Sequence, residues 1–121
     1  MSMPKQPKVW IVIPVYNRKD HTRACLESLE SLTYTNKQVV IVDDGSTDGT
    51  SEMLQKEFPN VDVLKGDGSY FWSKSMNVGL EKVLSVAGER DFVLTLNNDL
   101  VVEEDYLTNM VQASQNTSRA L

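Results

Sequence analysis

Residues 38–50, QVVIVDDGSTDGT, pass from a strand through a tight turn into a helix, and this stretch decides the fold class. The apolar run Gln38 to Val42 is rich in β-branched residues, as expected for a strand covered on both faces. Asp and Gly then favour a turn, because Asp bonds to nearby backbone and Gly adopts positive φ. We expect a helix from Thr47 to Phe58, with Asp48 as its N-cap.

The same unit recurs along the chain. Short apolar runs predict four buried strands, at Val9 to Val15, Gln38 to Val42, Val61 to Leu64 and Phe92 to Leu96. Apolar residues with helical spacing follow these runs, at Cys25, Leu29 and Leu32, at Leu80, Val83, Leu84 and Ala87, and at Tyr106, Leu107, Met110 and Val111. Such alternation implies right-handed crossovers, so we predict an α/β fold with a doubly wound, mainly parallel sheet. Ligands of such sheets bind beyond the carboxyl ends of the strands.

Length, charge and cysteine content exclude several classes of protein. The 121 residues suit one domain over residues 1–121, and a net charge of −5 with scattered Lys and Arg argues against nucleic-acid binding. The single cysteine, Cys25, excludes an internal disulfide and suits a reducing compartment, and we expect it to be buried. No apolar run is long enough to cross a bilayer and no secretory signal precedes Val9, so a cytoplasmic protein is expected.

Each predicted strand is followed by polar residues, which the fold would bring to one edge. Asp43, Asp44, Asp67 and Asp99 would gather negative charge there with few basic partners. Taken singly, each is an ordinary turn residue. Taken together, like charges raise one another's pKa and cost stability unless a cation or a hydrogen-bonding base ring lies among them. We therefore expect Mg²⁺ or Mn²⁺, which commonly use one or two carboxylates together with a ligand's phosphates.

Four segments, in this order, resemble family 2 glycosyltransferases of the GT-A fold. They are VIPVYNR (12–18), VVIVDDGSTDGT (39–50), GDGSYFWSKSMNVGL (66–80) and LTLNND (94–99), and the third is most similar to bacterial rhamnosyltransferase-like members. The pair PVYNR and DDGSTD is far more specific than a single Gly-rich loop. The resemblance spans almost the whole chain and implies the Rossmann-like, nucleotide-sugar-binding half of a GT-A domain, truncated before the acceptor-binding C-terminal part.

The resemblance implies a nucleotide site at the ends of the first three strands. The base and ribose are assigned to Pro14, Tyr16, Asn17 and Asp43, and Asp67 is placed near the base or sugar. Asp44 and Ser46 are expected to brace the loop. A phenol ring can stack on a base, and a carboxylate can accept the imide N–H of uracil or thymine. The expected donor is therefore a UDP-sugar or a dTDP-sugar.

The family's metal position, usually Asp-x-Asp, corresponds to Asn97-Asn98-Asp99. Asp99 matches the last carboxylate and Asn97 replaces the first, so Asp99 is expected to hold the metal with oxygens from the donor's diphosphate. Asn97, Asn98 and Trp72 are assigned to the diphosphate or the sugar. Alternatives stay open, because the Asn-Asn-Asp run also suits a simple strand-end turn, and Trp72 with Phe71 can equally cover the sheet edge.

Two departures from the family concern phosphate binding and catalysis. Many members carry Arg-Asn-x-Gly in the third helix, with the Arg near the phosphates, whereas this chain has Met76-Asn77-Val78-Gly79. Lys74 can supply that charge or can be a solvated surface residue. The family's general base lies downstream of the metal motif, so no catalytic residue is expected in this chain. Glu103 to Asp105 suit the first turn of a helix.

The resemblance implies a bacterial enzyme of polysaccharide biosynthesis, acting at the inner face of the membrane. It would transfer a sugar, with inversion, from a nucleotide-diphosphate donor to a hydroxyl of a saccharide or lipid-linked acceptor. A donor-binding part can bind without turnover, and uncovered apolar sheet surface would favour self-association. The alternatives are a non-catalytic nucleotide-binding module, a sugar-nucleotide pyrophosphorylase and a phosphoacceptor receiver domain. PVYNRKDHT lacks the pyrophosphorylase's Gly-rich phosphate loop, and the acid pair follows the second strand, where a receiver has it after the first.

Overall fold

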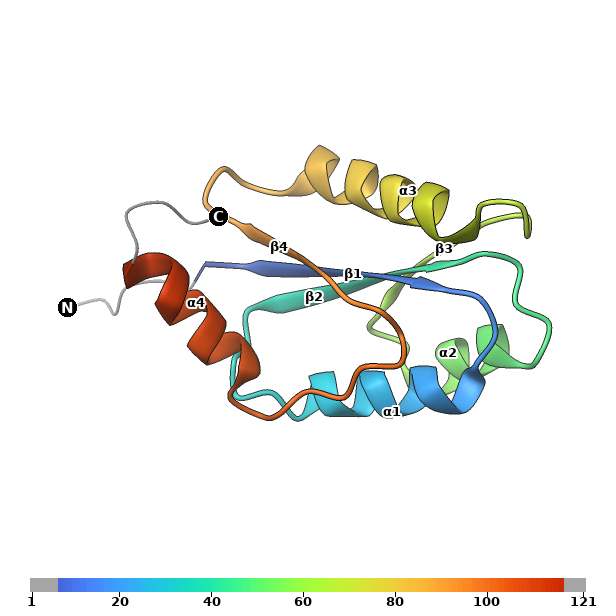
Figure 1. Cartoon of the computed structure of the whole chain (residues 1–121), viewed down its shortest axis with the longest axis horizontal. Coiled ribbons are helices and arrows are strands. Elements are labelled where there is room, and N and C mark those ends of the chain that lie inside the picture. Colours follow the sequence, from blue (N-terminus) through green and yellow to red (C-terminus); the bar gives the residue numbers. More distant parts are fainter. Residues whose placement is uncertain (1–6, 117–121) are drawn as a thin grey trace.

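The computed structural model describes residues 7–116, in which strands and helices alternate (Figure 1). The strands are β1 (Val9–Val15), β2 (Lys37–Asp43), β3 (Asp62–Lys65) and β4 (Phe92–Thr95). The helices are α1 (Lys19–Glu30), α2 (Thr50–Glu57), α3 (Phe71–Val86) and α4 (Tyr106–Asn116). Every predicted apolar run therefore overlaps a strand, and every segment with helical spacing overlaps a helix, although α1 ends at Glu30, before Leu32.

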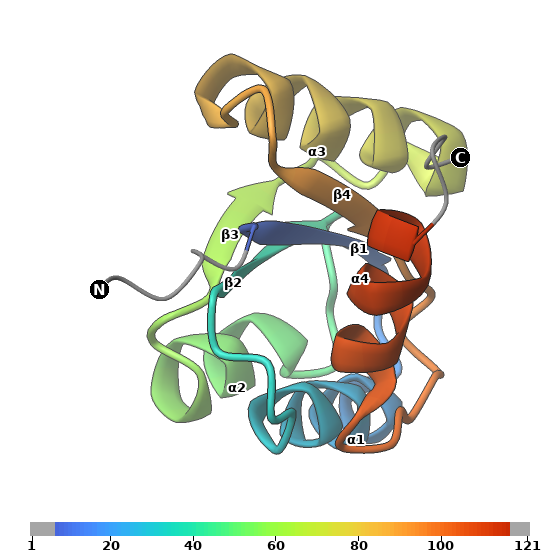
Figure 2. The same ribbon diagram turned by 90° about the vertical axis from the view of Figure 1, so that its left-hand side faces the viewer.

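The strands form one parallel sheet in the order β3-β2-β1-β4. β1 pairs with β2 from Val9, opposite Lys37, to Val15, opposite Asp43, and its first half also pairs with β4. Helices α1 and α2 cover one face of the sheet and α3 covers the other, as Figures 1 and 2 show. The predicted α/β fold is confirmed, and the chain changes direction across the sheet beside β1, where ligands of such folds bind.

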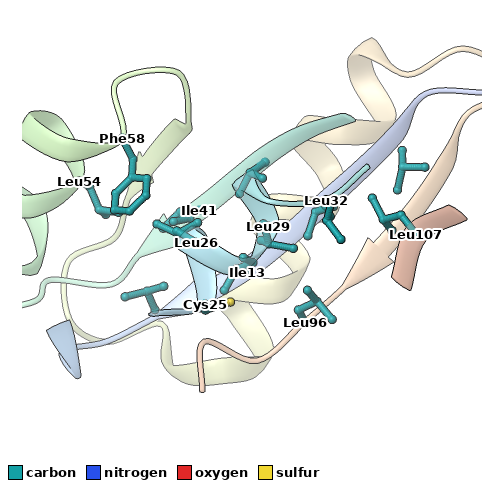
Figure 3. Packing of buried hydrophobic residues seen from close by; sticks show 14 of the residues in the cluster. Ile13, Cys25, Leu26, Leu29, Leu32, Ile41, Leu54, Phe58, Leu96 and Leu107 are labelled. Carbon is teal, nitrogen blue, oxygen red and sulfur yellow. The ribbon is translucent and has the colours of Figure 1, made fainter. Parts of the chain in front are cut away.

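Two apolar layers hold the helices against the sheet. The larger layer contains Leu26 and Leu29 of α1, Leu54 of α2 and Leu107 of α4 (Figure 3). The smaller layer lies beneath α3 and includes Val12 of the central strand. Because β1 places alternate side chains in the two layers, its seven residues are all buried, which explains the unbroken apolar run.

The start of α2 differs from the prediction. The helix begins at Thr50, because Gly49 precedes it with a φ of 94° and occupies the N-cap position. The Asp48 carboxylate accepts hydrogen bonds from the backbone N–H groups of Thr50 and Lys19, at 3.1 and 3.0 Å. Asp48 therefore joins the first turns of α1 and α2, so a predicted cap is in fact a link between two helices.

The inward face of α3 includes only part of its apolar spacing. Met76, Gly79 and Val83 are buried against the sheet, whereas Leu84, which belongs to the same spacing as Val83, is 70% exposed. The sheet covers only one side of the helix, and Leu84 lies outside that side. Within residues 7–116, every helix is too short or too polar to cross a bilayer.

Candidate functional site

A pocket of about 340 Å³ opens beyond the carboxyl ends of β1 and β2, against the first turn of α3. Its lining comes from all four segments that carry the family resemblance: Pro14, Val15, Tyr16, Arg18, Asp44, Gly68, Phe71, Trp72, Ser75 and Asn98. Its volume lies within the range of small-molecule sites. The pocket combines apolar and aromatic surface with a few polar groups, which suits a ligand that has both a ring system and a charged group.

The pocket gathers some of the predicted site residues and leaves others outside its lining. Pro14, Tyr16, Trp72 and Asn98 line it, and the ligand groups assigned to them stay predictions. The other predicted residues, which are not part of the lining, are Asn17, Asp43, Asp67, Lys74, Asn97 and Asp99. Sequence reasoning did not assign Val15, Arg18, Gly68 or Ser75 to the site, and it gave Asp44 a bracing role only.

Asp44 braces the loop between β3 and α3 against the end of β2. Its side chain is 3% exposed, and its two carboxylate oxygens accept hydrogen bonds from the backbone N–H groups of Gly68 and Phe71, both at 2.8 Å. Phe71 has a φ of 55°, an unfavourable value for a bulky residue, so the bond to Asp44 helps to hold a strained start to α3. Asp44 was expected to brace the loop after β2, but its carboxylate instead holds the loop between β3 and α3.

Asp43 and Ser46 shape the turn after β2. Asp43 is 1% exposed, and its oxygens accept hydrogen bonds from the backbone N–H of Ser46 and the hydroxyl of Ser51. The two bonds join the end of β2 to the turn that follows it and to the first turn of α2, and the carboxylate is outside the pocket lining. The assignment of Asp43 to the nucleotide stays a prediction, whereas Asp44 is the acid of this pair that reaches the pocket.

The segment after β1 is joined to the turn after β2. Asn17 donates its backbone N–H to Ser46 Oγ at 2.8 Å, and its side-chain oxygen accepts from the backbone N–H of Thr47 at 2.7 Å. Asn17 and Arg18 both adopt left-handed backbone conformations, with φ of 57° and 59°. Asn17 therefore acts through the backbone geometry that places Tyr16 and Arg18 at the pocket.

The run Asn97-Asn98-Asp99, which follows β4 after Leu96, contacts residues of α1, of α3 and of the segment after β1. Asn97 Oδ1 accepts a hydrogen bond from Trp72 Nε1 at 3.2 Å, and Asn98 Nδ2 donates to the hydroxyl of Thr22 at 3.1 Å. Asp99 Oδ2 lies 3.9 Å from Arg18 Nη1, and its side chain is 47% exposed. The run is thus more than a bare strand-end turn, because two of its side chains contact pocket-lining residues.

The four acids expected at one edge do not form a metal-binding cluster among the described residues. Among residues 7–116 there is no group of three His, Cys, Asp or Glu side chains that could hold a metal ion. Asp43 and Asp44 are satisfied by hydrogen-bond donors, and Asp99 has Arg18 beside it. Asp99 can still hold a divalent cation when a ligand is bound, because one accessible carboxylate is sufficient where the ligand's phosphates supply further oxygens.

Asp67 and Lys74 lie in or just after the loop between β3 and α3. The hydrogen bonds from the Ser69 hydroxyl and the Ser69 backbone N–H lower the pKa of Asp67, so this exposed carboxylate is charged at neutral pH. Lys74 Nζ lies 4.3 Å from the centre of the Tyr70 ring. Neither residue lines the pocket, so their roles toward the nucleotide stay predictions.

Cys25 is buried beneath the Asn97 segment and is expected to be unreactive in the folded protein. Burial, with a smaller contribution from the charge of Asp99, raises the pKa of the thiol to about 11. At pH 8 only about one thiol in a thousand is then the reactive thiolate. Labelling with a chromogenic disulfide at pH 8 should be slow without denaturant and complete in urea. Rapid labelling of the folded chain would show that this layer opens.

The comparison with known protein families settles the family. The profile of Glycosyl transferase family 2 matches residues 10–121. The chain belongs to this family. The match includes all four segments that line the pocket, so the candidate site lies in the part of the chain that defines the family.

The chain is also similar to individual known proteins. Glycosyltransferase GlyA of Streptococcus pneumoniae serotype 4 is 31% identical over 107 residues, 85% of this chain and 14% of that protein. S. aureus TarS 1-349 in complex with UDP-GlcNAc has a TM-score of 0.75 at 26% identity, over 89% of this chain and 32% of that one. The mannosyltransferase PcManGT from Pyrobaculum calidifontis, in complex with GDP-Man and Mn²⁺, shares the fold with a TM-score of 0.75 at 23% identity, again over 89% and 32%. This family 2 chain spans less than a third of the length of these three relatives.

Proposed function

We propose that this chain is the donor-binding part of a glycosyltransferase that uses a UDP-sugar or dTDP-sugar and a divalent metal. The observation that carries the proposal is the pocket at the ends of β1 and β2, in which Pro14 and Tyr16 offer a surface for a base while Arg18 and Asn98 lie beside Asp99. Family membership and the nucleotide-sugar complexes of TarS and PcManGT support this ligand class. Apolar rings next to a positive charge suit a nucleoside joined to a diphosphate.

In this proposal Asp99 holds Mg²⁺ or Mn²⁺, and Asn97 and Asn98 position the end of β4. A bound cation would offset the charge that develops on the leaving diphosphate. Trp72 holds Asn97 through its indole N–H, and its ring, 57% exposed, is available to a sugar at the pocket mouth. The PcManGT complex, which contains Mn²⁺, supports a metal in this fold.

The transfer itself would need residues beyond those of this site. We propose inversion at the sugar, with a saccharide or lipid-linked acceptor and a general base supplied by a further segment, in polysaccharide biosynthesis at the cytoplasmic face of a bacterial membrane. Within residues 7–116 the pocket lining contains one carboxylate, Asp44, and both of its oxygens are already bonded to backbone. The exposed apolar side chains of Leu84 and Val93 would pack against that segment or against a second copy.

Calorimetric titration with UDP, dTDP and GDP, with and without Mn²⁺, tests the proposal. UDP or dTDP should bind more tightly with Mn²⁺, and Asp99→Asn should lower that affinity by about tenfold or more, because a metal loses its carboxylate ligand. Glu89→Gln is the matched control, since it removes a carboxylate before β4, at the opposite end of the strands. Absence of nucleotide binding to the folded chain would contradict the proposal, and binding without any effect of metal would remove the cation from it.

A further inference from the structure

Arg18 carries a role that the sequence did not assign. We propose that Arg18 is the residue that binds the donor's diphosphate, and that its ion pair with Asp99 is the ligand-free form of the site. This deepens the proposed function and rests on it. The chemistry recognised is a diphosphate, which a guanidinium can grip through two parallel hydrogen bonds.

The backbone directs Arg18 to the pocket. Arg18 immediately precedes α1 with a φ of 59°, a conformation that L-residues seldom adopt and that needs support. The support comes from Asn17, whose bonds to Ser46 and Thr47 fix the preceding peptide. From this position Arg18 lines the pocket, and its Nη1 lies 3.9 Å from Asp99 Oδ2.

The pocket lining has one cationic side chain among the described residues, and the α3 positions where the family resemblance predicts a positive charge do not supply a second. Among residues 7–116, Arg18 is the one Lys or Arg in the lining. Lys74, expected to take the place of the family's third-helix Arg, lies over the Tyr70 ring at 4.3 Å. Met76, at the position of that Arg, is 6% exposed and packs in the apolar layer beneath α3. In this proposal Arg18, after β1, supplies the positive charge that the family resemblance predicts in α3.

The Arg18–Asp99 pair is suited to exchange its partners. Both side chains are about half exposed, at 63% and 47%, and such pairs are held weakly because water screens them. Without a ligand, Arg18 offsets the charge of Asp99. A cation on Asp99 competes with Arg18 for that carboxylate, and the released guanidinium can then face the phosphates. The metal and Arg18 should therefore compete for the Asp99 carboxylate. Both should strengthen binding of the diphosphate.

The decisive experiment compares Arg18→Gln with the wild-type chain toward two ligands, UDP with Mn²⁺ and Mn²⁺ alone. Affinity for UDP with Mn²⁺, measured by calorimetry, should fall about tenfold or more, because a charged hydrogen-bonding partner is lost. Affinity for Mn²⁺ alone, measured from the spectrum of free Mn²⁺, should stay equal or rise by about twofold, since Asp99 loses its competitor. Arg18→Lys keeps the charge but lacks the planar guanidinium. Its affinity for UDP with Mn²⁺ should lie between those of the wild-type chain and Arg18→Gln.

Controls separate failure of this inference from failure of the proposed function. Arg90→Gln removes the same charge from the turn before β4, at the other end of the strands, and should change neither affinity. Wild-type chain that binds UDP with Mn²⁺, together with Arg18→Gln that binds it equally well, would overturn the inference and leave the function standing. Weaker binding of Mn²⁺ alone to Arg18→Gln would also overturn it, because Arg18 would then support the metal site and not compete for it. A wild-type chain that fails to bind UDP would overturn both.

Discussion

Replacing Asp44 by alanine should lower the free energy of unfolding by about 2–4 kcal/mol and abolish nucleotide binding, the largest effect expected of any polar residue near the pocket. Asp44 is almost fully buried and accepts hydrogen bonds from the backbone N–H groups of Gly68 and Phe71. Alanine leaves both donors without their partner inside the protein. It also releases the loop that supplies Gly68, Phe71 and Trp72 to the pocket, so stability and binding should fall together.

Urea denaturation and UDP titration measure the two effects. Asp67→Ala is the matched control for stability, because Asp67 is an exposed acid of the same loop that accepts hydrogen bonds from the neighbouring Ser69. That variant should cost less than about 1 kcal/mol. Asp44→Asn keeps one acceptor oxygen, so its loss of stability should lie between those of Asp44→Ala and Asp67→Ala. Equal stability of Asp44→Ala and Asp67→Ala would show that Asp44 does not hold the loop.

The sequence predicts the sheet well because buried parallel strands have an unambiguous pattern. Val9 to Val15 is apolar at every position, and the structure buries all of it between two helical layers. The helix face is harder to predict, as Leu84 shows, because spacing alone cannot tell how wide a stripe the sheet will cover. The β2–α2 turn is harder still, since the bond from Lys19 to Asp48 depends on how α1 and α2 meet.

The site is predicted in outline, and its details depend on side-chain directions that sequence does not contain. The chain order correctly brings Tyr16, Trp72 and Asn98 to one edge. It cannot show which of two adjacent acids, Asp43 or Asp44, turns toward the pocket. The sequence did not predict that Arg18 lines the pocket, because its position depends on left-handed backbone conformations at Asn17 and Arg18. The residue types Asn and Arg do not by themselves indicate two such conformations in succession.

Gly79→Ala should destabilise the chain by about 1–3 kcal/mol, even though alanine favours helices by about 1 kcal/mol over glycine. A Cβ at Gly79 would lie 2.4 Å from Val12 Cγ1, closer than real Cβ atoms approach, and 3.1 Å from Val42 Cγ2, which is a tight contact. Val12 is fully buried in the central strand and cannot move aside. The clash must shift α3, whose first turns carry Trp72 and Ser75, so UDP affinity should also fall.

Shortening the opposing side chain should restore part of that loss. Val12→Ala alone leaves a cavity and should cost about 2 kcal/mol, whereas Gly79→Ala with Val12→Ala should cost at least about 1 kcal/mol less than the sum of the two. Gly88→Ala is the control, because the three heavy atoms nearest to its Cβ would belong to Asp91, at 3.5 Å or beyond. That variant should change stability by less than about 0.5 kcal/mol. Strict additivity of the Gly79 and Val12 changes in urea denaturation would mean that α3 does not approach the sheet at this glycine. Non-additivity together with recovered UDP affinity would show that the close packing of α3 on β1 sets the position of the pocket wall.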